Sequence, residues 1–169
     1  MRPIILVSVG VAAVIVAAGA YFELHDSAAP QANKALTQLQ SSGRSYGEPG
    51  DPARASRTVE IGIRELHDGR MYFYPDVVTV RPGEQIRFLV ANNGEFGHEF
   101  VLGSTRDNLV RVEARKRNEG PGNDPASVQV GSTERGELLW RFPKAGEFEI
   151  ADPLPGYRQA GLVGRIVVK

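Results

Sequence analysis

Few side chains in this 169-residue chain have the types that could do chemistry, because it has three histidines and no cysteine. The absence of cysteine excludes disulfides, zinc–thiolate sites and nucleophilic thiols. His98 stands near the start of the apolar run 97–103, and Asp152, Tyr157 and Leu162 follow later with four residues between successive members. No Ser/His/Asp arrangement is readable, so we predict that the chain is not an enzyme.

The elements that must position these residues read as short strands. From residue 57 onward, apolar residues alternate with polar ones, and turns containing Pro, Gly and Asn separate the runs. The segment 81–84, Arg-Pro-Gly-Glu, has proline for the first corner of a turn and Gly83 where a positive φ is needed. His67-Asp68-Gly69 reads as a hairpin turn. The pattern predicts an all-β, antiparallel sandwich.

One segment, residues 104–117, breaks the strand pattern. Ser104 with Asp107 resembles a helix-capping pair, and Leu109 with Val112 gives a narrow apolar stripe, so we expect one short helix. Its basic residues are Arg111, Arg115, Lys116 and Arg117. We interpret them as a solvated face, with docking to an acidic partner or to lipid phosphate as the alternative.

The N-terminus predicts export. Residues 3–22 are uncharged and apolar, and about 20 such residues can cross a bilayer. Residues 1–22 are therefore a signal peptide or a retained membrane anchor. Arg2 before this run, and Glu23 and Asp26 after it, place the rest of the chain outside the cytoplasm, in the periplasm.

Residues 23–57 are rich in Ala, Ser, Gln, Gly and Pro, which predicts a flexible linker with a reach of about 30 Å. A tether suits an anchored protein, so we favour retention of the anchor. The N-terminal helix would then attach the protein to the membrane. Lysine plus arginine and aspartate plus glutamate both number 20. This balance gives no field that would recruit nucleic acid.

Several motifs occur in one order: residues 73–88 (Phe-Tyr-Pro-Asp-Val-Val-Thr-Val-Arg-Pro-Gly-Glu-Gln-Ile-Arg-Phe), Asn92-Asn93, residues 98–103 and the final hairpin 148–168. With these motifs, residues 58–169 resemble the exported cupredoxin family. The resemblance implies a Greek-key, cupredoxin-like β-sandwich with one short inserted helix.

In the cupredoxin family, the last hairpin has a strand that ends in Cys, followed by the motif P-x-P-G-H and by a turn that ends in Met. These residues hold copper together with an upstream His. Here the same positions are Asp152, Tyr157 and Leu162, and only the upstream His98 matches. The resemblance therefore implies a non-blue metal site of His98, Asp152 and Tyr157, whose oxygen-rich donors favour Cu(II) or Fe(III), while Leu162 cannot ligate.

The same residues permit a metal-free alternative. A buried carboxylate beside an imidazole raises the histidine pKa, so His98, Asp152 and Tyr157 can form a stable polar cluster without a metal. Three hypotheses follow. One is a tethered protein with a non-blue Cu(II) site, acting in periplasmic copper handling or beside a copper or respiratory system. The others are a metal-free module that binds another periplasmic or membrane protein, and an electron carrier, which the missing cysteine disfavours.

Overall fold

The computed structural model describes residues 44–169, with the exception of Ala55. The predicted signal or anchor segment, 1–22, and the linker as far as residue 43 lie outside the described residues. Within the described part, no helix combines the length and the apolar character that a bilayer crossing needs.

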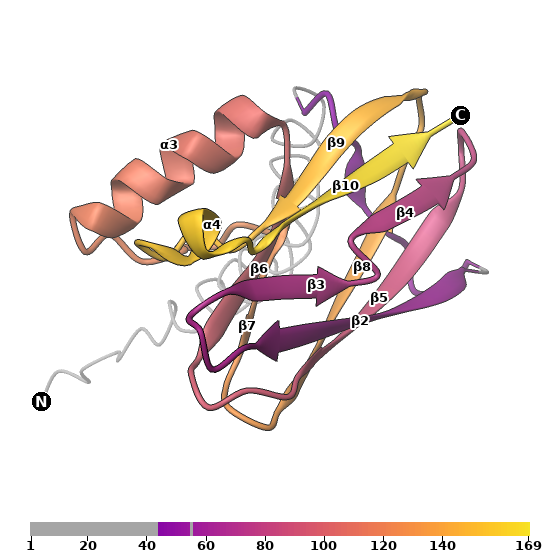
Figure 1. The fold of residues 1–169 in the computed structure, drawn as a ribbon. Helices are drawn as coiled ribbons and strands as arrows, with labels where there is room; N and C mark the ends of the chain where they lie inside the picture. The colour runs from indigo at the N-terminus through magenta and orange to yellow at the C-terminus, as the bar shows by residue number, and fades with distance from the viewer. Residues whose placement is uncertain (1–43, 55) are drawn as a thin grey trace, which may run out of the picture. The chain divides into compact units, whose positions relative to one another are not determined.

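The described residues form two five-stranded sheets that pack face to face (Figure 1). One sheet has the order β1 (Glu48–Pro49), β8 (Arg135–Arg141), β5 (Gln85–Asn92), β2 (Arg57–Glu65), β3 (Met71–Tyr74). The other has the order β4 (Val77–Val80), β10 (Val163–Val168), β9 (Gly146–Ala151), β6 (His98–Gly103), β7 (Ser127–Val130). The predicted all-β sandwich is confirmed.

Two strand pairs run parallel, so the expectation of a wholly antiparallel sandwich is wrong. β2 pairs with β5, with Val59 opposite Phe88, and β10 pairs with β4, with Ile166 opposite Val78. The chain leaves the first sheet after β3 and enters the second at β4. Side chains alternate with a period of two in parallel and in antiparallel strands alike, so the sequence pattern does not encode the direction in which two strands pair.

Large apolar side chains from both sheets fill the space between them. Phe100 lies against Phe73 and Phe88, with ring centroids 5.6 Å and 5.9 Å apart. Leu162 is fully buried in the same core, together with Trp140. Burial of each such side chain stabilises the fold by about 1.5–3 kcal/mol.

The folded domain begins before the predicted boundary at residue 58. The ring of Tyr46 stacks on Trp140 with centroids 5.8 Å apart, and the indole Nε1 donates to the Tyr46 carbonyl at 2.8 Å. β1 then pairs with the edge of β8. The described residues between 44 and 57 therefore do not behave as a flexible linker, because Tyr46 packs on the buried Trp140 and β1 pairs with β8.

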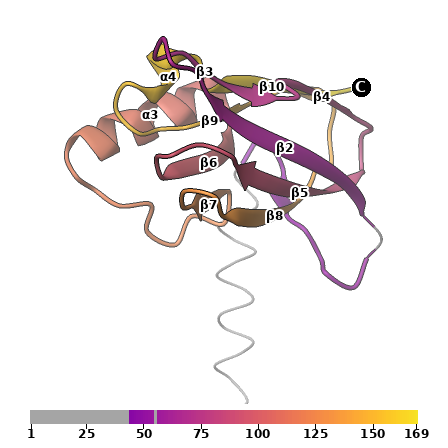
Figure 2. The ribbon, with the colours of Figure 1, turned by 60° about the horizontal axis from the view of Figure 1, so that its bottom comes forward.

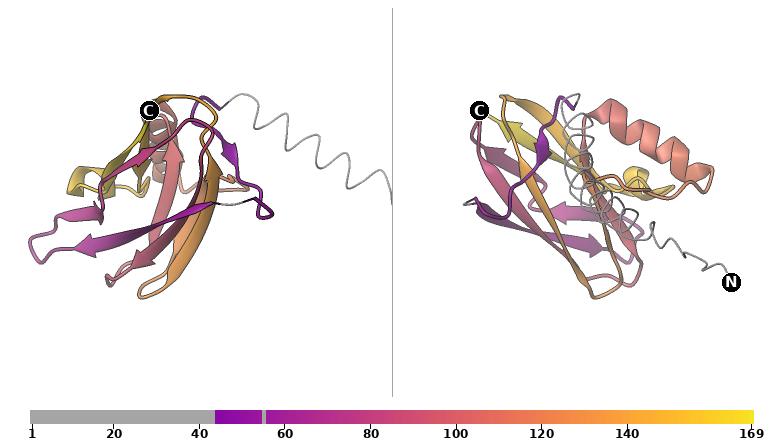
Figure 3. Two further views of the ribbon diagram at one scale, coloured as in Figure 1. Left: turned by 90° about the vertical axis from the view of Figure 1, so that its right-hand side faces the viewer. Right: turned by 180° about the vertical axis from the view of Figure 1, so that it is seen from behind.

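The predicted helix is present as α3 (Thr105–Lys116), and Ser104 is its N-cap, with Oγ accepting from the backbone N–H of Asp107 at 3.1 Å. Seen from behind in Figure 3, α3 lies outside the sandwich, and it packs on β6 and β9. The predicted apolar stripe is only half right, because Val112 is buried but Leu109 is exposed.

Polar side chains replace that stripe on the inner side of α3. Arg111 bonds to Asp124 and Arg115 to Glu99, each at 2.6 Å, so these two arginines do not form a solvated face. A second short helix, α4 (Tyr157–Ala160), lies in the last hairpin on the same side of the molecule as α3 (Figure 2).

Candidate functional site

The fold brings three strand ends together at one end of the sandwich. Glu65 is the last residue of β2, His98 is the first residue of β6, and Asp152 directly follows β9. β6 and β9 pair antiparallel, with Val101 opposite Ala151, so Asp152 lies beside the start of β6. Because backbone pairing fixes these positions, the side chains meet across long separations in sequence.

His98 bonds to a carboxylate through each of its ring nitrogens. Nδ1 lies 2.9 Å from Oδ2 of Asp152, and Nε2 lies 3.0 Å from Oε1 of Glu65. The side chain of His98 is 0% exposed, that of Asp152 1% and that of Glu65 12%. The Tyr157 ring packs on the imidazole with centroids 5.1 Å apart. We call Glu65, His98, Asp152 and Tyr157 the His98 cluster.

Backbone groups complete the hydrogen bonding of both carboxylates. Asp152 accepts from the N–H of Glu99 at 3.2 Å and from that of Leu154 at 2.9 Å. Glu65 accepts from the N–H groups of Glu95 and Phe96, both at 3.1 Å. Each carboxylate oxygen therefore has at least one donor, which is what a buried charged group requires.

The two carboxyl groups favour the protonated form of the imidazole. Burial alone would lower the pKa of His98, but the hydrogen bonds to Asp152 and Glu65 outweigh it and place the pKa above its ordinary value. Burial also tends to raise the pKa of Glu65, yet the N–H of Glu95, the His98 ring and the N–H of Phe96 hold it below its usual range. The imidazole thus lies between two carboxyl groups that raise its affinity for a proton.

Asp152 and Tyr157 are less ready to carry negative charge. Burial raises the pKa of Asp152, although His98 and the N–H groups of Leu154 and Glu99 oppose this effect. Burial, followed by repulsion from Asp152 and Glu65, raises the pKa of the Tyr157 phenol. A phenol whose ionisation is disfavoured is a poor metal ligand.

A blue copper centre does not fit these residues. Such a centre needs one thiolate and two imidazoles in a trigonal plane, and the chain has no cysteine. Both nitrogens of His98 already face carboxylates, and Leu162 is an apolar core residue. Across the described residues, no group of three or more His, Cys, Asp or Glu side chains is placed to hold a metal.

Of the residues selected from the sequence, His98, Asp152 and Tyr157 do lie in contact, as expected. Their role as a non-blue Cu(II) site stays a prediction. Glu65 was missed, because it lies 33 residues before His98 and continues an ordinary strand pattern. The available signal was its place at the end of a strand, directly before the Leu66–Gly69 turn, where a carboxylate can reach a neighbouring loop.

Comparison with known proteins gives the family. No protein-family model matches the chain. A copper-resistant cuproprotein, CopI of Rubrivivax gelatinosus, is 43% identical over 125 residues, which are 73% of each chain. The chain belongs to the CopI family. CopI of Pseudomonas aeruginosa is a second relative, 31% identical over 157 residues, with 75% of this chain and 84% of that protein covered.

Solved structures place this CopI-family member among the cupredoxin folds. Auracyanin A, described as a blue copper protein from Chloroflexus aurantiacus, superposes with a TM-score of 0.56 and 21% identity. The match covers 68% of this chain and all of auracyanin A. The sequence resemblance to cupredoxins is therefore confirmed at the level of the fold, and the CopI-family chain is a degenerate member without the copper-binding cysteine.

Proposed function

We propose that this CopI-family protein acts in copper resistance in the periplasm, as a tethered, non-enzymatic domain that binds another protein of a copper system. One observation carries the proposal: carboxyl groups engage both ring nitrogens of His98, beside the hairpin where the cupredoxin resemblance implies a metal. The hairpin is thus held by hydrogen bonds. The copper context is supported by the relatives, which are named copper-resistant cuproproteins.

The cluster also orients an apolar surface that suits a protein partner. Glu65 binds the N–H of Phe96, whose side chain is 53% exposed, and Leu66 next to Glu65 is exposed as well. Exposed aromatic side chains on a fixed loop are typical anchors of protein interfaces. The His98 cluster therefore keeps Phe96 in place, and Phe96 contacts the partner.

Copper tolerance of a strain that lacks this protein tests the role. The wild-type chain should restore growth on copper, and Phe96→Ser should not, although it folds. Tyr74→Ser is the matched control, because Tyr74 is an exposed aromatic residue at the end of β3. Full restoration by Phe96→Ser would contradict the proposed contact. Two further measurements test the anchor and the location. The full-length chain should be found in the membrane fraction, and protease added to intact spheroplasts should reach the domain.

A second candidate function, a non-blue Cu(II) site, is favoured by the facing donors of His98 and Asp152. Electron paramagnetic resonance of the protein with one equivalent of Cu(II) separates the two candidates. Nitrogen coupling that disappears in His98→Gln would establish the Cu(II) site. A spectrum unchanged by His98→Gln would show that His98 does not bind the metal, and it would favour the metal-free function. Asp152→Cys with Tyr157→His and Leu162→Met should return a blue centre if the hairpin keeps the cupredoxin geometry.

A further inference from the structure

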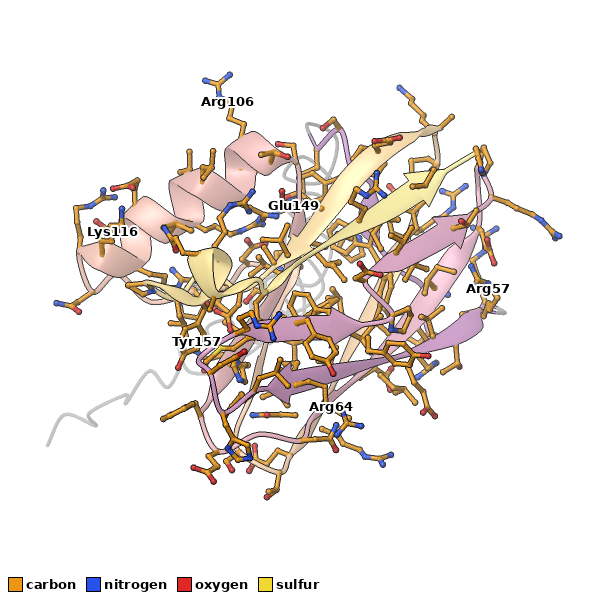
Figure 4. The ribbon with its side chains drawn as sticks, viewed as in Figure 1. Arg57, Arg64, Arg106, Lys116, Glu149 and Tyr157 are labelled. Atoms are coloured by element: carbon orange, nitrogen blue, oxygen red, sulfur yellow. The ribbon has the colours of Figure 1, made fainter. Side chains whose placement is uncertain are left out.

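The outer side of α3 carries apolar side chains that the fold leaves exposed. Leu109 and Val110, neighbours in the middle of the helix, are 48% and 61% exposed. Figure 4 shows Arg106 near one end of α3, where it points away from the sandwich. Arg106, Glu113 and the apolar pair line one shallow groove along the helix. We call Arg106, Leu109, Val110 and Glu113 the α3 face. It lies outside the His98 cluster.

The polarity of α3 is inverted relative to an ordinary surface helix. Such a helix turns its apolar side chains to the core and its polar ones to water. The buried residues of α3 are Asn108 and Val112. Asn108 donates to the carboxylate of Glu149 at 3.0 Å, and Arg111 and Arg115 pair with acidic residues of the domain. Polar bonds thus hold most of the inner side, and the outward apolar pair does not serve the packing of the helix on its own chain.

The charges of the α3 face have opposite signs on the two sides of the apolar pair. Arg106 comes three residues before Leu109, and Glu113 comes three residues after Val110. With a rise of about 1.5 Å per residue, each charge lies about 5 Å along the helix from the midpoint of the pair. Seven positions make nearly two turns, so both charges project from the same side. Lys116 donates to Oε1 of Glu113 at 2.7 Å, and a carboxylate has a second oxygen for another donor.

We propose that the α3 face binds the α3 face of a second copy of this chain, with the two helices antiparallel about a two-fold axis. Leu109 and Val110 of both copies then meet at the axis, and Arg106 of each copy faces Glu113 of the other. A two-fold interface requires a patch that is complementary to itself, and the order basic, apolar, acidic along α3 provides one.

The size of the α3 face sets the strength of this contact. Exposed ion pairs contribute about 1 kcal/mol or less each. One face of a twelve-residue helix is smaller than the roughly 800 Å² per partner of a stable interface. The dimer is therefore weak and reversible, and its amount depends on the protein concentration.

An anionic lipid surface fits the α3 face less well than a second copy does. A helix that lies on such a membrane combines an inserted apolar side with basic residues. Glu113 projects from the same side as the apolar pair, and anionic lipid would repel it. Of the basic residues near it, Lys116 already pairs with Glu113 and Arg117 with Glu119, each at 2.7 Å. The opposite charges on the two sides of the apolar pair favour a second copy.

Cross-linking through one engineered cysteine tests the proposal, because the native chain has no cysteine. Val110→Cys in the full-length protein, in mild detergent, should give a covalent dimer with a short bis-maleimide. The yield should rise with protein concentration. Arg165→Cys, at an exposed position on β10, is the control and should give much less dimer under the same conditions. Equal yields from the two variants would overturn the proposal.

Exchange of charges tests the antiparallel arrangement. In the Val110→Cys protein, Glu113→Arg places like charges at both contacts and should lower the yield of dimer about tenfold. Arg106→Glu should have the same effect. The two changes together return opposite charges to both contacts and should restore the yield. A yield that stays low with both changes would contradict the arrangement.

A lipid arm separates the two possible occupants of the α3 face. Phosphatidylglycerol is added to the detergent micelles that hold the Val110→Cys protein, at constant ionic strength. The yield of dimer should stay the same if a second copy occupies the face. Loss of the dimer in the presence of phosphatidylglycerol would mean that the face binds anionic lipid, and it would overturn the proposal.

Discussion

The imidazole of His98 separates two carboxylates that would otherwise face each other across a buried space. Asp152 is almost completely buried and Glu65 nearly so, and each directs an oxygen to one ring nitrogen. Removal of one partner from a buried ion pair is far more costly than removal of a surface charge, because the remaining charge has neither water nor a counter-ion. The residue therefore matters for folding whatever its relation to copper.

We predict that His98→Ala lowers the free energy of unfolding by about 3 kcal/mol, because it leaves two buried carboxyl groups without their shared hydrogen-bond partner. Urea denaturation followed by tryptophan fluorescence measures the change, since Trp140 lies in the core. His67→Ala, in the exposed turn after β2, is the control and should be nearly neutral. A loss of less than about 1 kcal/mol in His98→Ala would argue against the ion-pair cluster.

The raised pKa of His98 also gives a pH dependence. A histidine with a higher pKa in the folded state binds its proton more tightly when folded, so its contribution is complete below its ordinary value of 6.5. That contribution is lost as the pH rises through the folded-state pKa. We predict that the free energy of unfolding falls above pH 6.5 in the wild type, relative to His98→Gln. Parallel curves for the two proteins between neutral and alkaline pH would refute this linkage.

At the scale of the elements, local signals predicted local structure. Ser104 and Asp107 predicted the start of α3, and Gly83 has the positive φ that its turn requires. The family spacing placed His98 beside Asp152. Partners distant in sequence were not predictable in the same way. Glu65 reaches His98 from another sheet, and Arg115 turns inward because Glu99 is buried in β6 beneath it.

The segment before β2 is the element whose contribution is easiest to measure. A chain that begins at residue 58 lacks Tyr46, its stacking on Trp140 and the hydrogen bond from the indole. We predict that it is less stable than a chain that begins at residue 44 by about 3 kcal/mol, from the lost aromatic burial and one hydrogen bond. Tyr46→Ala in the longer chain should reproduce most of the loss. Equal urea midpoints for the two chains would show that residues 44–57 do not stabilise the domain.

At the scale of the whole molecule, an apolar core joins the two sheets, and the His98 cluster closes one end of them. Contacts between side chains and backbone groups of the described residues hold both parts together. Ligand binding to the folded state at 100 times the dissociation constant adds about 2.7 kcal/mol of stability. The melting temperature is therefore a sensitive measure of whether copper belongs to the fold.

We predict that neither a chelator nor one equivalent of Cu(II) changes the melting temperature of the wild-type protein by more than a few degrees. Differential scanning calorimetry in the two conditions is the measurement. The variant Asp152→Cys with Tyr157→His and Leu162→Met supplies the positive control, because its melting temperature should rise on copper addition. A similar rise in the wild type would show that the native cluster takes up the metal.

The position of β10 affects how the chain reaches its folded state. β10 is the last described strand, yet it lies inside its sheet, between β4 and β9, and it pairs with both. Until residues 163–168 have left the ribosome, β4 and β9 each present an open edge, and open edges invite pairing between chains. The sheet therefore stays incomplete until residues 163–168 can pair with both neighbours. A nascent chain halted before β10 would be a substrate for chaperones and proteases, and not a smaller version of the folded domain.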